Sequence, residues 1–172
     1  MGPMVMSTIC DVLLGFGANL GNRRETLLAA WRELGELPEI EKVRISRLIE
    51  TQAFGGPTNQ PQYLNAVGLI RTTLTPQRLL DVLHDIERRF GRVRTERWEP
   101  RTLDLDILLF GDLIIKTETL TIPHPEMLRR DFVMEPAVGI APDFVHPEIG
   151  LTLRSWSVRH YPSESEGGNK SY

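Results

Sequence analysis

Three features of the sequence predict a single α+β domain in which helices pack on an antiparallel sheet. The chain has 172 residues, of which 41% are hydrophobic and 25% charged, which suits one globular domain with a buried core. Apolar residues recur with a period of about two residues in some segments and about 3.6 residues in others. The resulting order, β-α-β-β-α-β, is that of a ferredoxin-like α/β sandwich.

The first segments are expected to form a β-α-β unit. Residues 9–16 read as a strand, followed by an amphipathic helix over 24–37 and a second strand over 43–51. The stretch GFGANLG, residues 15–21, is similar to a dinucleotide-binding turn, but Leu20 stands where that pattern needs its third glycine. We therefore interpret it as a tight turn from strand to helix.

The next segments add a strand and the second helix. Residues 52–62 are rich in Gly, Pro, Asn and Gln and are long enough for a binding loop ahead of a strand over 63–72. Thr75 is expected to cap the second helix, Pro76 to occupy its first position, and Gly91 to end it. The apolar stripe of this helix consists of Leu79, Leu80, Leu83, Ile86 and Phe90.

The last third of the chain supplies the fourth strand and smaller elements. A strand over 103–110 is followed by a Gly-Asp turn and a short returning strand near 113–115. We expect a short helix over 131–140 and a last helix or strand over 151–160.

Composition excludes several classes of protein. No apolar run approaches the roughly 20 residues of a membrane helix, and the first residues lack the regions of a secretory signal, so we expect a cytoplasmic protein. Cys10 is the only cysteine, which excludes an internal disulfide, and the net charge of -3 argues against a general nucleic-acid binder. We expect residues 1–8 to be flexible, residues 9–160 to form a single domain, and residues 161–172 to be a disordered tail.

Two carboxylates stand one residue apart in the strand over 103–110. Because strand side chains alternate, Asp104, Asp106, Leu108 and Phe110 are predicted to share one face. The two acidic Cα atoms lie roughly 6.6 Å apart, and like charges at about 6 Å repel by about 3 kcal/mol at an effective dielectric of about 20. An exposed pair needs no partner, whereas a pair in a cleft needs cations.

Positive charge is concentrated immediately before this strand. The segment GRVRTERWEPR contains Arg92, Arg94, Arg97 and Arg101, and guanidinium groups suit bidentate phosphate contacts. No P-loop pattern occurs, so bound phosphates would be held by side chains and metal.

Five further side chains are candidates that each have an ordinary structural alternative. Tyr63 and Asn65 are expected to face the same side at the start of their strand. They would form either a surface on which a ring stacks beside a hydrogen-bonding amide, or an ordinary core residue and an ordinary turn residue. His84 and Glu87 share a helical face, as a metal pair or a surface pair. His124 stands between two prolines, where a ligand contact and a structural role are equally open.

Taken together, GANLGN, FGG with NQPQYLN, GRVRTERWEPRTLDLDILLFGD, TIPHPEM and RRDF closely resemble the 6-hydroxymethyl-7,8-dihydropterin pyrophosphokinase family of folate biosynthesis. The resemblance runs from about residue 9 to residue 150 and implies a ferredoxin-like fold. It implies that the pyrophosphoryl group of ATP is transferred to the hydroxymethyl oxygen of the reduced pterin, releasing AMP. Two Mg²⁺ ions and ATP as co-substrate are implied with it.

The resemblance also implies roles for individual residues. The metal-binding positions are Asp104 and Asp106. The pterin-binding positions are Thr51, Phe54, Tyr63, Asn65, Trp98 and Phe132. The ATP-binding positions are His84, Glu87, Arg92, Arg94, Arg101, Ile107, Thr121, His124 and Arg130. The catalytic positions are Arg92, Arg94, Arg101, Asp104 and Asp106.

Two other functions fit parts of the same pattern. A two-metal nucleotidyltransferase also uses Asp-x-Asp on a strand, but such enzymes usually place a Gly-Ser turn before the acids, and the sequence has no Gly-Ser pair. A non-catalytic RNA-binding ferredoxin-like module would need a basic sheet face, whereas Asp104 and Asp106 would repel phosphates without metal. We expect ATP and the pterin as partners of a monomer, with no nucleic acid and no membrane.

Overall fold

The computed structural model of the chain describes residues 8–19, 21–51, 63–91 and 103–160. Its elements are, in order, β1 (Cys10–Ala18), α1 (Arg23–Leu34), β2 (Ile40–Ile45), β3 (Ile49–Thr51), β4 (Tyr63–Thr72), α2 (Pro76–Gly91), β5 (Leu103–Phe110), β6 (Ile115–Lys116), β7 (Thr121–Ile122), the 3-10 turn η1 (Met127–Arg129), α3 (Asp131–Ile140), β8 (Val145–His146), β9 (Leu151–Thr152) and α4 (Leu153–His160).

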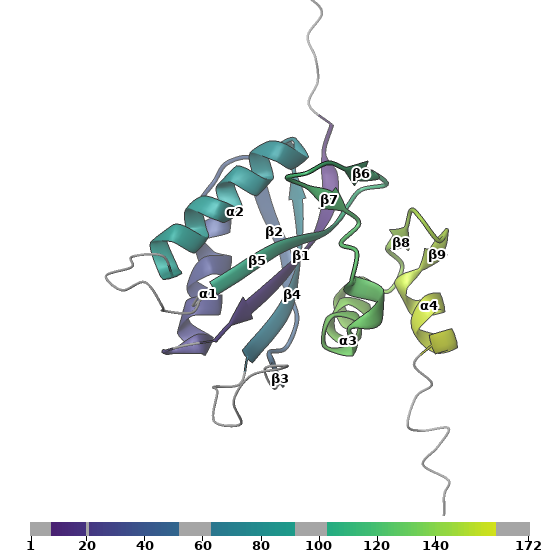
Figure 1. The fold of residues 1–172 in the computed structure, drawn as a ribbon. Coiled ribbons are helices and arrows are strands. Elements are labelled where there is room, and N and C mark those ends of the chain that lie inside the picture. Colours follow the sequence, from purple (N-terminus) through teal and green to yellow (C-terminus); the bar gives the residue numbers. More distant parts are fainter. Residues whose placement is uncertain (1–7, 20, 52–62, 92–102, 161–172) are drawn as a thin grey trace, which may run out of the picture.

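The main sheet has the strand order β2-β4-β1-β5, with β3 also paired to β4, and its pairings are antiparallel. This order is that of the ferredoxin-like sandwich and confirms the predicted α+β class. Helices α1 and α2 lie on one side of the sheet, and α3 and α4 lie on the other (Figure 1). The sheet is therefore covered on both faces.

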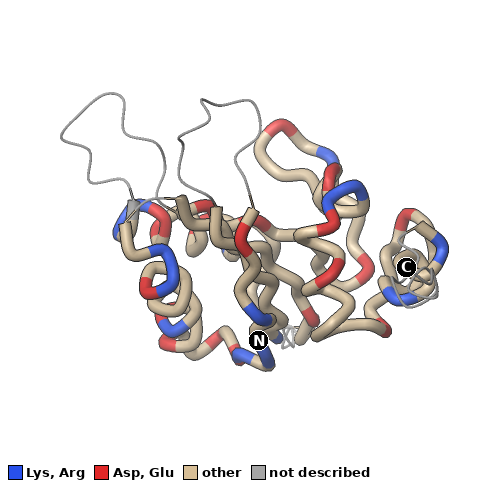
Figure 2. The backbone as a smooth tube through the Cα atoms, turned by 90° about the horizontal axis from the view of Figure 1, so that it is seen from below, with Lys and Arg blue, Asp and Glu red and all other residues tan. Residues whose placement is uncertain are grey.

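Each face of the sheet has its own apolar core. Leu14 and Phe16 of β1 pack with Leu27 of α1 and Leu83 of α2. On the other side, Leu13 belongs to the cluster that α3 and α4 complete. Charged residues of both signs are interspersed over the outer elements, while the central strands are mostly uncharged (Figure 2). Within the described ranges, no helix is long and apolar enough to cross a membrane.

Several predicted elements agree with the structure residue for residue. Strands β4 and β5 and helix α3 have the predicted bounds, and α2 begins at Pro76 as expected. Thr75 Oγ1 accepts the Arg78 N–H at 3.2 Å, which is the predicted N-terminal cap. Residues 151–160 contain both a short strand, β9, and a helix, α4. The terminal residues 1–7 and 161–172 lie outside the described residues.

The single strand predicted over 43–51 is wrong, because residues 46–48 separate two strands, β2 and β3. The Ser46 N–H donates to the Val67 carbonyl at 2.8 Å, and Ser46 Oγ accepts the Val67 N–H at 2.9 Å. A short strand does lie near the predicted residues 113–115, at Ile115–Lys116, but the prediction that it returns along β5 is wrong. Ile115 and Lys116 pair with β7, so this hairpin stands apart from the main sheet.

The interpretation of GFGANLG as a turn is only partly correct. Gly15 and Gly17 belong to β1, and the change of direction comes after Ala18. Gly21 has a φ of 68°, a left-handed conformation that favours glycine. The Asn22 side chain then accepts the Glu25 N–H at 3.3 Å and caps α1.

A bulge in β5 changes the predicted alternation of its side chains. Leu13 pairs with Leu109 whereas Leu14 pairs with Ile107, so Leu108 is the extra residue. Leu108 and Leu109 consequently face the core of α3, and Phe110 turns to the core of α1 and α2. The prediction that Phe110 shares a face with the two aspartates is therefore wrong.

Candidate functional site

One end of the sheet and the start of α3 enclose a cavity of about 460 Å³. Asp104 and Asp106 of β5 line it, as do Tyr63 and Asn65 of β4. The remaining lining residues are Gly15, Phe16, Gly17, Thr51, Ala66, Leu108, His124, Arg129, Arg130, Asp131, Phe132 and Val133. The cavity thus joins the paired carboxylates to an aromatic and amide surface.

Two glycines of β1 form the floor beside the carboxylates. Gly15 pairs with Asp106, and Gly17 pairs with Asp104 on one side and Asn65 on the other. A Cβ added at Gly17 would lie 3.4 Å from Asn65 Oδ1 and 4.0 Å from a ring carbon of Tyr63. The missing side chains therefore keep the floor open for a ligand.

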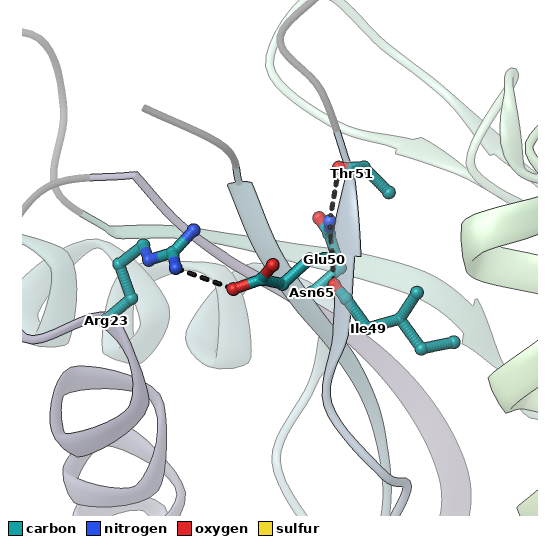
Figure 3. A network of polar contacts seen from close by, with 5 residues as sticks. All are labelled: Arg23, Ile49, Glu50, Thr51 and Asn65. Atoms are coloured by element: carbon teal, nitrogen blue, oxygen red, sulfur yellow. Dashed lines mark hydrogen bonds and ion pairs between the residues drawn. The ribbon is translucent and has the colours of Figure 1, made fainter. Parts of the chain in front are cut away.

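Strand β3 is held on both of its sides (Figure 3). Asn65 Nδ2 donates to Thr51 Oγ1 at 2.7 Å and to the Ile49 carbonyl at 3.5 Å. On the opposite side of the strand, Glu50 forms an ion pair with Arg23 at 2.7 Å. With its Nδ2 bound to β3, Asn65 keeps its Oδ1 as an acceptor above Gly17.

The start of α3 forms the opposite wall of the cavity. Asp131 Oδ1 accepts the Phe132 N–H at 2.8 Å. The Arg130 guanidinium lies 5.8 Å from the centre of the Phe132 ring, within the range of a cation–π contact. An aromatic face and a positive charge therefore meet at this wall.

His124 is held in one neutral tautomer at the cavity. Its Nδ1 accepts the Glu126 N–H at 3.1 Å, so the proton of the neutral ring is on Nε2. Burial lowers the pKa of His124, the Asp106 and Glu126 charges oppose that change, and Arg130 adds to it. The ring is therefore a neutral hydrogen-bond donor at neutral pH.

Four of the residues expected around ATP lie outside the cavity. Glu87 is buried between α2 and β5, where it accepts the Leu105 N–H at 2.9 Å. Ile107 belongs to the core of α1 and α2, His84 is half-buried on α2, and Thr121 is exposed in β7. Phe54, Arg92, Arg94, Trp98 and Arg101 lie outside the described residues.

The two aspartates of the cavity suit a hard cation that is coordinated partly by the protein and partly by a bound ligand. Within the described segments, no group of three or more His, Cys, Asp and Glu side chains is placed to bind a metal. Mg²⁺ is commonly bound by one or two carboxylates together with phosphate oxygens and water. Asp104 and Asp106 line the cavity and suit that arrangement, whereas the Glu87 carboxylate is buried and accepts the Leu105 N–H.

Sequence reasoning missed Gly15 and Gly17 as site residues. The available signal was a glycine at alternate positions within an otherwise apolar strand, which marks close approach of another group to the backbone. Arg129 and Asp131 were also missed, although both belong to the stretch RRDF that contributes to the family resemblance.

Comparison with known proteins assigns the chain to a family. The family described as 7,8-dihydro-6-hydroxymethylpterin-pyrophosphokinase matches residues 13–142. A Synechocystis protein named 2-amino-4-hydroxy-6-hydroxymethyldihydropteridine pyrophosphokinase is 44% identical over 141 residues, covering 82% of this chain and 71% of that protein. A protein of the same name from Haemophilus influenzae is 46% identical over 134 residues, covering 78% of this chain and 83% of that protein. The chain belongs to this family of ATP-dependent diphosphotransferases, as its sequence resemblance predicts.

A solved structure gives the same fold. The chain matches Plasmodium falciparum HPPK-DHPS with pteroate at a TM-score of 0.72 and 14% identity. The match covers 97% of this chain and 45% of that longer chain. The likeness supports the architecture.

Proposed function

We propose that the chain catalyses Mg²⁺-dependent transfer of the pyrophosphoryl group of ATP to 6-hydroxymethyl-7,8-dihydropterin, yielding the pterin diphosphate and AMP. The reaction would belong to folate biosynthesis. The protein would act as a cytoplasmic monomer without nucleic-acid or membrane partners. The observation that carries the proposal is the cavity, because Asp104 and Asp106 line it together with Tyr63, Asn65 and Phe132. Family membership supports the reaction class.

The aromatic end of the cavity would bind the pterin. Tyr63 and Phe132 would stack on the two faces of the ring, and stacking supplies affinity. Thr51 and Asn65 would bind the polar edge, and the Oδ1 of Asn65, which points over Gly17, is a suitable acceptor. A site built to satisfy these polar groups rejects analogues that lack them. The backbone of Phe54 and the Trp98 side chain complete the proposed pterin set by resemblance.

The carboxylate end would bind the triphosphate. Asp104 and Asp106 would hold Mg²⁺, which neutralises phosphate oxygens and polarises the reacting phosphoryl group when bound. His124 Nε2–H and the Arg130 guanidinium would donate to phosphate oxygens from the other wall. The remaining ATP contacts proposed from the resemblance are His84, Glu87, Arg92, Arg94, Arg101, Ile107 and Thr121.

The alignment of the pterin with the triphosphate of ATP decides which phosphorus is attacked. An ordinary kinase directs the acceptor oxygen at the γ-phosphorus of ATP, whereas a pyrophosphokinase directs it at the β-phosphorus. The new bond forms from the hydroxymethyl oxygen to the β-phosphorus, and the bond from that phosphorus to the AMP oxygen breaks. Holding the pterin at Tyr63 and Phe132 and the triphosphate at Asp104 and Asp106 would align these atoms.

Product analysis tests the proposal. The protein is incubated with ATP, Mg²⁺ and the pterin, and nucleotides and pterins are separated by chromatography. We expect equal amounts of AMP and pterin diphosphate, both abolished by a chelator. ADP as the main product would contradict the proposal, and pyrophosphate with an adenylylated acceptor would indicate a nucleotidyltransferase. RNA binding that survives the chelator would indicate the non-catalytic module.

A further inference from the structure

The outer edge of β5 is bound by groups from outside the sheet. Among the described strands of the main sheet, β5 pairs only with β1, so its other edge would leave backbone groups unpaired. The Glu87 carboxylate accepts the Leu105 N–H at 2.9 Å. The Leu108 carbonyl accepts the His124 N–H, also at 2.9 Å. These two bonds lie on either side of Asp106 along the strand.

Glu87 is an unusual residue for its position in the core. Its side chain is 4% exposed and follows Ile86, which is fully buried in the same helix. Burying a carboxylate is unfavourable unless hydrogen bonds compensate for its lost hydration, and an apolar residue would suit this core at no such cost. We therefore attribute the presence of a carboxylate at this buried position to its hydrogen bond with the Leu105 N–H.

The bound amide belongs to the residue between the two aspartates. Side chains alternate here, so Leu105 points into the core of α1 and α2 while Asp104 and Asp106 point into the cavity. A carboxylate that fixes the Leu105 N–H also fixes the direction of the backbone on both sides of it. The bond further joins α2 to β5 close to Gly91 and Leu103, the two ends of the segment that carries Arg92, Arg94 and Arg101.

We infer that Glu87 is a positioning residue, which holds Asp104 and Asp106 at the separation needed for cation binding through its hydrogen bond to the Leu105 amide. This inference rests on the proposed function of the two aspartates. It assigns Glu87 a role through the backbone of β5 that is separate from any contact with ATP.

Two substitutions of Glu87 and one control test the inference. Glu87→Leu removes the acceptor and keeps the bulk, whereas Glu87→Gln keeps an oxygen that can accept the Leu105 N–H. The control is Glu33→Leu, which removes a partly exposed carboxylate of α1 that pairs with Arg89 of α2 at 2.9 Å. This control disturbs the contact between the helices and leaves the edge of β5 intact.

The direct readout is hydrogen exchange of the Leu105 amide, measured by NMR on the full chain. We expect Glu87→Leu to raise its exchange rate at least about tenfold, because an amide that loses its acceptor loses most of its protection. Glu87→Gln should stay within about threefold of the parent, and Glu33→Leu should not change this amide. Unchanged exchange in Glu87→Leu would overturn the inference. If Glu87→Leu does not fold, Glu87→Asp withdraws the carboxylate by one methylene and should give an intermediate rate.

The second readout separates positioning from nucleotide binding. We expect Glu87→Leu to weaken Mn²⁺ binding, measured with a non-hydrolysable ATP analogue, by at least about threefold and to lower kcat by at least about tenfold. Glu87→Gln should recover most of both losses. Equal increases in the KM for ATP in the two variants, with kcat and Mn²⁺ binding unchanged, would show a ligand contact only and overturn the inference. Failure of the proposed function itself would appear separately, as absence of AMP and pterin diphosphate with the parent protein.

Discussion

The tripeptide His-Pro-Glu occurs twice, at 124–126 and 146–148, and its two copies share a local structure but differ in surroundings. The Glu126 N–H donates to His124 Nδ1 at 3.1 Å, and the Glu148 N–H donates to His146 Nδ1 at 3.3 Å. Burial lowers the pKa of both histidines. The first ring lines the cavity with Asp106, whereas the second is 3% exposed and lies in β8, outside the cavity.

This comparison shows that the tripeptide specifies a turn and a tautomer, and that the fold decides whether the ring can meet a ligand. The chain preceding His124 runs beside β5, where the His124 N–H binds the Leu108 carbonyl. The chain around His146 instead forms a separate two-stranded hairpin with β9. His146 is therefore an internal control for His124.

The largest effect is expected from Asp104 and Asp106, which line the same cavity as His124, whereas His146 lies outside it. Asp106→Asn or Asp104→Ala should lower turnover by at least about a hundredfold, because each removes a proposed metal ligand. The free energy of unfolding should stay the same or rise, since repulsion between the two carboxylates is relieved. Steady-state kinetics and chemical denaturation measure both quantities. Near-normal turnover in both variants, with normal unfolding, would remove the basis for the site.

The two histidines provide the next test. His124→Ala should lower kcat/KM at least about tenfold, because a neutral donor at the proposed phosphate site is lost. His146→Ala should leave kcat/KM within about twofold of the parent protein. Both variants should lose about 1–3 kcal/mol of unfolding free energy, since each leaves a backbone N–H without its acceptor. Equal activity losses in the two variants would contradict the distinction between the two regions.

A third test compares two glycines of the cavity floor. Neither Gly15 nor Gly17 has a positive φ, so alanine is not strained at either position. Gly17→Ala should weaken pterin binding at least about tenfold, because its Cβ would contact Asn65 Oδ1 and approach Tyr63. Gly15→Ala is the matched control, since its Cβ would meet only the flexible end of Leu108 at 3.4 Å. Calorimetric titration with the pterin measures both, and equal affinities would contradict the proposed pterin position.

The smallest effect is a pH dependence that both histidines share. Because burial lowers the pKa of each in the folded chain below the ordinary 6.5, the unfolded chain binds more protons between the folded value and 6.5. The contribution of the two neutral rings to the free energy of unfolding is present above pH 6.5 and is lost as the pH falls through their pKa values in the folded chain. His146→Gln should reduce the slope of unfolding free energy against pH without changing activity at neutral pH. A steeper slope in that variant would contradict the assignment.

The regular elements were predictable where local sequence and tertiary environment agree. Strand β4 alternates between two buried faces, and α2 has both a capping threonine and a proline at its start, so their limits follow from neighbouring residues. The spacing of the paired carboxylates predicted that they share one face, and both line the cavity, whereas their proposed role as metal ligands came from the family resemblance.

The remaining features depend on contacts between distant residues. Ser46 interrupts the strand predicted over 43–51, where it binds Val67 of β4, and nothing in the local sequence requires that bond. The bulge at Leu108 arises from pairing with β1 and reverses the sides of the residues after it. The buried bond of Glu87 to Leu105 also could not be predicted, because a helical glutamate beside charged neighbours suggests an exposed residue.

We propose that a two-phosphoryl unit moves from ATP to the pterin in one transfer. The most direct measurement follows ATP labelled separately at its α-, β- and γ-phosphorus atoms through a reaction with the pterin and Mg²⁺. We expect the β and γ labels to appear together in the pterin diphosphate and the α label to stay with AMP. Transfer of the γ label alone, or appearance of the α label in the pterin product, would contradict it.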